Sequence, residues 1–244
     1  MTTISTVTPL PYCTGRLPAT RPNALHDMDV YGAGVIPTPP ANVVVPKALY
    51  PIDGNDSVGD CTIAGVAHLK TAWHAKYNLP YTPPTEPTIV AEYFNLSGGQ
   101  DTGLNEANVL QTWQTAGLFG SKLSAYAPVK PTNILGIHQA VAFFDGAYLG
   151  IECPQSAQEQ FQNGEPWEYV AGSPVVGGHC IVALGYTQTG LLCATWGGVA
   201  EVSYGFCAHF LDEVFCLLSG ILVERKGDSL GIDLASLKAD LAKV

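Results

Sequence analysis

Residues 54–68 read GNDSVGDCTIAGVAH, a polar, glycine-bearing turn followed by a small and mostly apolar series. The apolar series predicts a helix that begins near Cys61 and packs closely against a core. Asp60 precedes this helix, where a carboxylate can accept hydrogen bonds from the free amides of the first turn. The positive end of the helix dipole would favour a thiolate at Cys61. The alternative is a structural cysteine at the start of a core helix, since cysteine is among the most buried residue types.

The chain is 244 residues long, with 47% hydrophobic and 13% charged residues. This is enough for one large domain or for two lobes around a shared cleft. The net charge of −10 marks an acidic protein. A nucleic acid or an anionic membrane surface would need clustered lysine and arginine on its partner. The composition therefore argues against a nucleic-acid partner and against a membrane partner.

The N-terminus lacks the basic and apolar regions of a secretory signal peptide. No apolar run approaches the ~18 residues that a membrane span needs. The seven cysteines contain no CxxC pair, so neither a disulfide framework nor a metal site is expected. An odd cysteine count also leaves at least one thiol free, and we expect that of Cys61 to be free. The sequence thus predicts a cytoplasmic protein with reduced thiols, no signal peptide and no cofactor.

Composition and periodicity divide the chain into four segments. Residues 1–50, rich in proline and threonine, are expected to form an extended arm over the body. Residues 51–125 are expected to form a helical lobe that contains the Cys61 helix. Residues 126–222 are expected to form an antiparallel β lobe, and residues 223–244 a C-terminal helix. The predicted fold class is α+β.

Individual elements follow from apolar periodicity and from glycine, proline and asparagine breaks. The predicted helices span residues 61–77, 88–95, 105–116, 133–144, 155–162, 212–218 and 231–244. The predicted strands span residues 126–129, 147–151, 180–186, 191–196 and 202–206. A glycine-bearing turn joins the apolar runs 180–186 and 191–196, which predicts that these two strands pair antiparallel.

His179 follows two glycines and opens the clearest predicted strand. An imidazole beside a cysteine can take the thiol proton and later pass it to a leaving group. A lone histidine in such a position is more often structural, and only its pairing with the Cys61 stretch favours a catalytic role. Together the two residues predict a thiol–imidazole pair.

These motifs resemble those of the papain-like cysteine peptidase superfamily. Asn55 precedes Cys61 by six residues, as the oxyanion-hole glutamine of these enzymes precedes their nucleophile. Thr195-Trp196-Gly197 ends the strand after His179, where these enzymes carry Asn-Ser-Trp-Gly. The resemblance implies a papain-like two-lobe fold, with a helical N-terminal lobe and an antiparallel β C-terminal lobe.

The resemblance also implies roles for single residues. Cys61 would be the nucleophile, His179 its base, Asn55 an oxyanion donor and Thr195 a weak orienting group, because Ala194 stands where these enzymes have the orienting asparagine. The expected substrate cleft is formed by Gly59, Asp60, Gly178 and Trp196. The charge of Asp60 would oppose thiolate formation and raise the thiol pKa. Trp196 is expected to pack over His179 and shield it.

Two other groups of residues are expected to have structural rather than catalytic roles. His68 lies seven residues after Cys61, ~10 Å along a helix axis, which is too far to share a proton. We expect it to bond to a neighbouring loop. His209, Asp212 and Glu213 lack a diagnostic metal-binding spacing and are expected at the surface or in a loop.

The chain further resembles uncharacterised papain-fold proteins of phages, prophages and bacteria, through residues 37–41, 54–61, 195–197 and 231–234. Three functions are therefore considered. The first is a thiol hydrolase, a peptidase or amidase acting on a peptide or protein substrate through an acyl-enzyme. The second is a degenerate papain-fold protein that binds other proteins, for example as a component of a phage virion. The third is a peptidoglycan amidase, for which the sequence offers no room for a wall-binding module.

Overall fold

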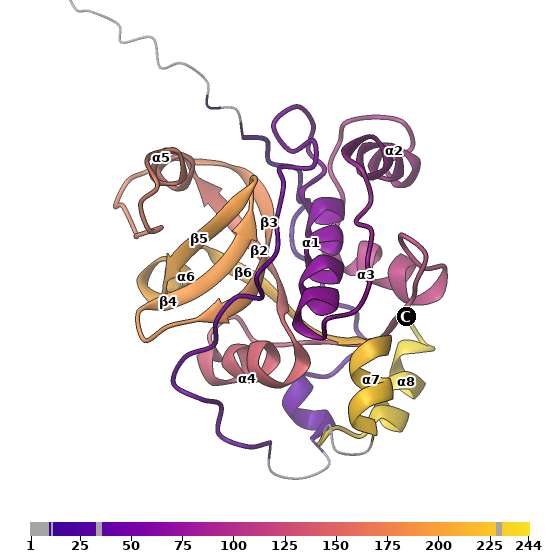
Figure 1. The fold of residues 1–244 in the computed structure, drawn as a ribbon. Helices are drawn as coiled ribbons and strands as arrows, with labels where there is room; N and C mark the ends of the chain where they lie inside the picture. The colour runs from indigo at the N-terminus through magenta and orange to yellow at the C-terminus, as the bar shows by residue number, and fades with distance from the viewer. Residues whose placement is uncertain (1–9, 11, 33–35, 228–230) are drawn as a thin grey trace, which may run out of the picture.

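Helix α1 (Cys61–Lys76) lies between a β-sheet and two further helices, α2 (Glu86–Leu96) and α3 (Glu106–Thr115). The computed structural model describes residues 10, 12–32, 36–227 and 231–244. Every residue of α1 from Cys61 to Lys70 is buried. Figure 1 shows α1 beside the sheet, with α2 and α3 on its other side. The predicted Cys61 helix is confirmed, and so are the two helices that follow it.

The second half of the chain forms one six-stranded sheet in the order β1-β6-β2-β3-β4-β5, with every neighbouring pair antiparallel. Helices lie between the strands and after them. The strands are β1 (Leu123–Pro128), β2 (Ala147–Pro154), β3 (Val175–Tyr186), β4 (Gly190–Thr195), β5 (Gly198–Ser203) and β6 (Leu211–Ser219). The remaining helices are α4 (Ile134–Phe144), α5 (Gln155–Asn163), α6 (Tyr204–Phe210), α7 (Gly220–Lys226) and α8 (Leu234–Leu241). The predicted α+β class, with helices first and an antiparallel sheet second, is confirmed.

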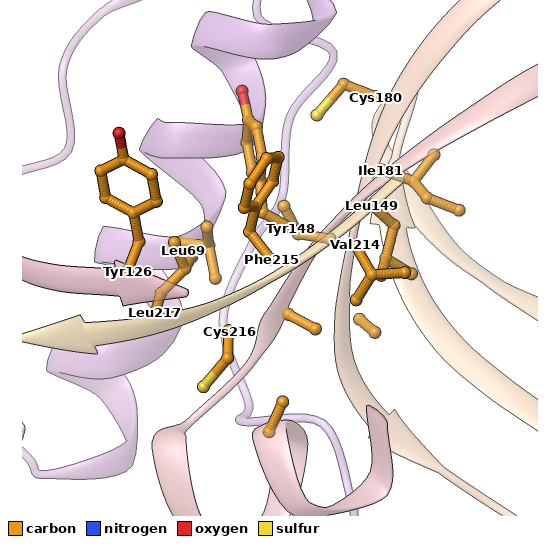
Figure 2. Packing of buried hydrophobic residues seen from close by; sticks show 14 of the residues in the cluster. Leu69, Tyr126, Tyr148, Leu149, Cys180, Ile181, Val214, Phe215, Cys216 and Leu217 are labelled. Carbon is orange, nitrogen blue, oxygen red and sulfur yellow. The ribbon is translucent and has the colours of Figure 1, made fainter. Parts of the chain in front are cut away.

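The helix predicted over residues 212–218 is wrong, because these residues belong to strand β6. This strand lies between β1 and β2, and its residues from Glu213 to Ser219 are all buried. Figure 2 shows the side chain of Leu217 on one face of β6 and that of Cys216 on the opposite face. A strand buried on both faces lacks the polar–apolar alternation that identifies half-buried strands, so its apolar run reads equally well as a helix.

Two smaller predictions also need correction. The strand predicted over residues 202–206 ends at Ser203, and the next residues begin α6, whose N-cap is the Ser203 hydroxyl. The segment 223–244 contains the end of α7 and the whole of α8 rather than a single helix.

The close contact of α1 with the sheet depends on Gly65. A Cβ atom at this position would lie 3.0 Å from Cε2 of Tyr148 and 3.3 Å from Sγ of Cys180. Tyr148 and Cys180 point towards α1 from β2 and β3 (Figure 2). The Tyr148 hydroxyl donates a hydrogen bond to the carbonyl of Thr62. The missing side chain thus lets the first turns of α1 rest directly on the centre of the sheet.

Most described residues before α1 form neither helix nor strand, apart from a short 3₁₀ helix, η1 (Met28–Tyr31). Contacts hold this segment to the body at several points. Val43 pairs with Tyr186 at the end of β3, and the Tyr31 carbonyl accepts from the amide of Asp233 before α8. Among the described residues, no helix is both long and apolar enough to cross a membrane.

Substitution Gly65→Ala is expected to destabilise the protein. Alanine normally stabilises a helix interior relative to glycine by ~1 kcal/mol, but here the added methyl group meets fully buried neighbours. Overpacking of this kind typically costs about 1–3 kcal/mol. Urea denaturation of Gly65→Ala should therefore show a loss of unfolding free energy. The control is Gly205→Ala on the exposed side of α6, where an added Cβ would make only an ordinary van der Waals contact, 3.7 Å from Oγ of Ser203. Equal effects of the two substitutions would contradict the packing described here.

Candidate active site

Cys61 and His179 lie on the wall of one small cavity. Cys61 is the first residue of α1 and His179 lies in β3, and their exposed fractions are 2% and 1%. The cavity measures about 10 Å³, roughly enough for one water molecule. Asn55, Thr195 and Trp196 also line it. Four residues that the sequence singled out as catalytic candidates therefore meet at one point, together with one of the expected cleft residues.

Each of the two reactive side chains has a defined partner. The backbone N–H of Cys180, the residue after His179, donates to Sγ of Cys61 at 3.4 Å. Nε2 of His179 lies 2.7 Å from Oγ1 of Thr195. Nδ1 of His179 is buried and has no hydrogen-bond partner among the described residues. The imidazole is thus held through one nitrogen, while the other has no partner among the described residues.

Trp196 reaches His179 through the turn between β4 and β5. Thr195 pairs with Gly198, so the connection is the two-residue loop Trp196-Gly197. Both loop residues have positive φ, 41° and 87°, as in the type I′ turn that suits a β-hairpin. The indole stacks on the imidazole with ring centroids 4.3 Å apart and an interplanar angle of 18°. This agrees with the expectation that Trp196 packs over His179 and shields it.

Asp60 differs from its expected behaviour. It is the N-cap residue of α1, but its side chain makes no capping hydrogen bond. It is completely buried, and burial raises its pKa to about 8, an effect that the Asn55 side chain opposes. Burial therefore favours the protonated form of the Asp60 carboxyl. The predicted cap is wrong, but the charge of Asp60 does add to the rise in the pKa of the Cys61 thiol, as expected.

Burial dominates the acid–base state of the pair. It raises the pKa of the Cys61 thiol to about 12, while the amide of Cys180 pulls this pKa down. Burial also lowers the pKa of His179 to about 3, and the charge of Arg16 adds to that effect. At neutral pH both groups are therefore uncharged in this structure. The elevated thiol pKa agrees in direction with the expectation, but its main cause is burial.

The N-terminal segment Tyr12–Leu17, which we call the arm strand, is held beside the buried pair by hydrogen bonds. The amide of Cys13 donates to the carbonyl of Asn55 at 2.8 Å, and Nε1 of Trp196 donates to the carbonyl of Cys13 at 3.2 Å. The amides of Gly15 and Arg16 both donate to the carbonyl of Gly178, at 3.0 and 2.9 Å. The arm strand thus bonds to Asn55 and Trp196, which line the cavity, and to Gly178, which precedes His179.

Glycines allow the arm strand to lie this close. A Cβ atom on Gly15 would lie 1.8 Å from the carbonyl oxygen of Gly59, and one on Gly178 would lie 2.3 Å from that of Arg16. A Cβ atom on Gly103 would lie 2.3 Å from the carbonyl oxygen of Gly15. Gly59 and Gly178, expected as cleft residues, therefore contact the chain's own arm strand.

His68 lines the same cavity as Cys61, although its helix spacing indicated a site too distant to take part. Its Nε2 lies 2.8 Å from the carbonyl of Pro51 and 3.2 Å from a carboxylate oxygen of Asp53. The expected bond to a neighbouring loop is therefore present. The sequence did not reveal that the cavity extends along two turns of α1, so that Cys61 and His68 both line it together with His179 of β3.

Asp212 is exposed, as expected, but the expectation that Glu213 lies at the surface or in a loop is wrong. Both belong to β6, and Glu213 is 6% exposed. They meet Arg16 of the arm strand, a residue that sequence reasoning did not single out. His209 lies on α6 and stacks on Tyr169. Among the described residues, no group of three or more His, Cys, Asp or Glu is placed to hold a metal ion.

The buried Asp60 should make stability depend on pH. An unfolded aspartate has a pKa near ~3.9, so between pH 4 and 8 the folded chain holds a proton that the unfolded chain has lost. Stability should therefore fall as pH rises through this window, by up to ~1.4 kcal/mol per pH unit from this group. Urea denaturation at pH 5 and pH 8 should show that Asp60→Asn loses less stability than the unsubstituted chain. The exposed Asp56→Asn is the control, and an identical pH dependence in Asp60→Asn would contradict the buried neutral carboxyl.

Several solved structures have the same fold as this chain. No known family model matches the sequence, and no curated protein matches it significantly. Xylellain, a cysteine protease from Xylella fastidiosa, superposes with a TM-score of 0.67 at 13% identity over 88% of this chain and 99% of its own. The cysteine protease and lectin-like domains of Cwp84, a surface layer associated protein of Clostridium difficile, give 0.62 at 10% identity over 86% of this chain and 56% of theirs.

A cysteine protease of Carica candamarcensis gives a TM-score of 0.52 at 12% identity, over 74% of this chain and 99% of its own. Identities this low establish the fold and not the activity. The chain therefore has the papain-like fold, as its short motifs predict.

Proposed function

We propose that this chain is a papain-like thiol hydrolase, a peptidase or amidase that acts through Cys61 and His179. One observation carries the proposal. A thiol at a helix N-terminus and an imidazole on a strand line the same cavity, and the imidazole is held through Nε2 while Nδ1 is unpartnered. A nucleophile, a base and a group that orients the base form the arrangement that covalent acyl transfer requires.

The proposed reaction begins with transfer of the Sγ proton of Cys61 to Nδ1 of His179. The thiolate then attacks the carbonyl carbon of an amide bond and forms a tetrahedral intermediate. The side-chain N–H groups of Asn55, which lines the cavity, and the amide of Cys61 would donate to the oxyanion. His179 returns the proton to the leaving amine, which departs and leaves a thioester on Cys61. Water, deprotonated by His179, hydrolyses the thioester and restores the thiol.

The closed structure is a resting state under this proposal. One of the two Nδ2 hydrogens of Asn55 already bonds to the carbonyl of Val58 at 3.1 Å, and the arm strand fills the space that a substrate needs. Displacement of the arm strand would bring water and a substrate to the cavity. It would also remove much of the burial that keeps Cys61 and His179 uncharged, so the thiolate–imidazolium form would become accessible.

The second candidate is a degenerate papain-fold protein that binds other proteins, as in a phage virion. Two observations favour it. The partner of His179 is the hydroxyl of Thr195, a weaker orienting group than an amide or carboxylate, and both members of the pair are uncharged in the closed state. The peptidoglycan amidase remains a third hypothesis, which clearing of cell-wall suspensions would test.

An arm-displaced variant separates an enzyme from a binding protein. Gly15→Leu places a side chain where even a Cβ atom collides with the Gly59 carbonyl, and it alters none of the proposed catalytic residues. We expect this full-length variant to react with an epoxysuccinyl or iodoacetamide probe at Cys61 at least about tenfold faster than the unsubstituted chain, and to hydrolyse a fluorogenic peptide library.

Three controls make the result specific. Gly205→Leu introduces the same side chain at an exposed helix position and should change neither rate. Adding Cys61→Ala or His179→Ala to Gly15→Leu should abolish hydrolysis, and mass spectrometry should locate the probe on Cys61 rather than on Cys13. A folded Gly15→Leu chain that hydrolyses nothing would favour the binding protein.

The role of Thr195 is tested separately in the Gly15→Leu background. Thr195→Val keeps the shape of the side chain and removes the hydroxyl that holds Nε2 of His179. Loss of one such hydrogen bond corresponds to ~1.4 kcal/mol, so we expect turnover to fall about tenfold. Thr82→Val, at an exposed position in the loop before α2, is the control. Unchanged turnover in Thr195→Val would show that Thr195 does not orient the imidazole.

A further inference from the structure

Arg16 of the arm strand occupies a pocket lined by acids. Its Nη2 lies 2.8 Å from a carboxylate oxygen of Asp212 and donates to the carbonyl of Ile151 at 3.1 Å. Its Nη1 lies 3.7 Å from Glu213. The Arg16 side chain is only 2% exposed. A charged side chain this deeply buried requires charged partners, and strand β6 supplies two of them.

A third carboxyl group lies in the same place. Glu106, the first residue of α3, is completely buried, and neither of its carboxylate oxygens has a hydrogen-bond partner at standard geometry among the described residues. Burial raises its pKa well above the usual range, Glu213 adds to this rise and Arg16 opposes it. Burial likewise raises the pKa of Glu213 to about 7, again against the effect of Arg16. Both buried carboxyls therefore respond to the charge of one arginine.

The pocket also has room for the stem of a long side chain. A Cβ atom on Gly150 would lie 2.9 Å from Cδ and Nε of Arg16, so a larger residue in β2 would close the pocket. One recess is thus lined by Glu106 of α3, by Asp212 and Glu213 of β6, and by Gly150 of β2. An acidic recess of this depth does not stabilise the fold by itself, because buried carboxyls without a cation are costly.

The recess lies next to the proposed nucleophile. The amides of Gly15 and Arg16 both donate to the carbonyl of Gly178, and Gly178 precedes His179. The amide of Gly15 also lowers the pKa of the Cys61 thiol, and the amide of Leu104 donates to the carbonyl of Gly15 at 2.8 Å. The backbone that carries the arginine therefore passes directly over Cys61.

We propose that the recess formed by Asp212, Glu213, Glu106 and Gly150 is a specificity pocket for an arginine or lysine side chain of the substrate, and that Arg16 occupies it in the closed state. The inference rests on the proposed function and adds a substrate class to it. Arginine should be preferred to lysine, because a planar guanidinium can place one nitrogen on Asp212 and the Ile151 carbonyl and the other towards Glu213. An apolar side chain would leave buried carboxyls without a cation.

A binding experiment tests the pocket without requiring catalysis. Full-length Arg16→Ala and Arg16→Gln are titrated by calorimetry with N-acetyl-arginine methylamide and with N-acetyl-citrulline methylamide, which has the same shape without the charge. We expect the arginine compound to bind at least about tenfold more tightly and to raise the melting temperature. The Arg16→Gln variant keeps a polar side chain in the recess if Arg16→Ala does not fold. Adding Glu213→Gln should abolish the preference for arginine.

Three outcomes would overturn the pocket: equal affinity for the two compounds, no binding to a folded variant, and a preference that survives Glu213→Gln. Turnover by Gly15→Leu of peptides that differ only in arginine, lysine or norleucine gives the second measurement. Hydrolysis without a preference for a basic residue would refute the pocket and leave the thiol hydrolase in place. Arginine-selective binding without any hydrolysis would retain the pocket and refute the thiol hydrolase.

Discussion

The packing of α1 against the centre of the sheet is the contact on which the rest of the structure depends. Gly65 lets the helix rest on Tyr148 and Cys180, and this closeness brings Cys61 to within 3.4 Å of the Cys180 amide. His179 precedes that amide in β3, so the same contact sets the position of the imidazole relative to the thiol. A helix shifted outward by one side chain would separate the Cys61 thiol from the His179 imidazole, whatever the residues between them.

Burial decides which chemistry this arrangement can perform. With the arm strand in place, Cys61 and His179 are both buried and both uncharged at neutral pH. The arm strand is held by backbone hydrogen bonds to Gly178 and Asn55 and by the pairing of Arg16 with Asp212 and Glu213. Polar contacts of this kind can be exchanged for equivalent contacts with a substrate. Apolar packing of the same segment could not be exchanged in this way.

The sequence predicted the parts of the structure that local patterns encode. Cys61 at a helix start, His179 at a strand and Trp196 over the imidazole follow from a turn, two glycines and a Trp-Gly hairpin. Strand β6 could not be recognised, because burial of both faces removes the alternation that marks a strand. The recess around Arg16 could not be found either, since its members lie in β2, α3 and β6, and only the order of strands in the sheet brings them to the arm strand.

The central claim is that Cys61 and His179 form a reactive pair that the arm strand keeps closed. The pH dependence of iodoacetamide alkylation at Cys61, followed by mass spectrometry, tests it most directly. In the unsubstituted chain, alkylation should be slow and should follow no titration near neutral pH. In Gly15→Leu it should follow an apparent pKa below the ~8.5 of a free cysteine, and adding His179→Gln should move this pKa back up. An apparent pKa at or above that of a free cysteine in Gly15→Leu, unchanged by His179→Gln, would contradict the account.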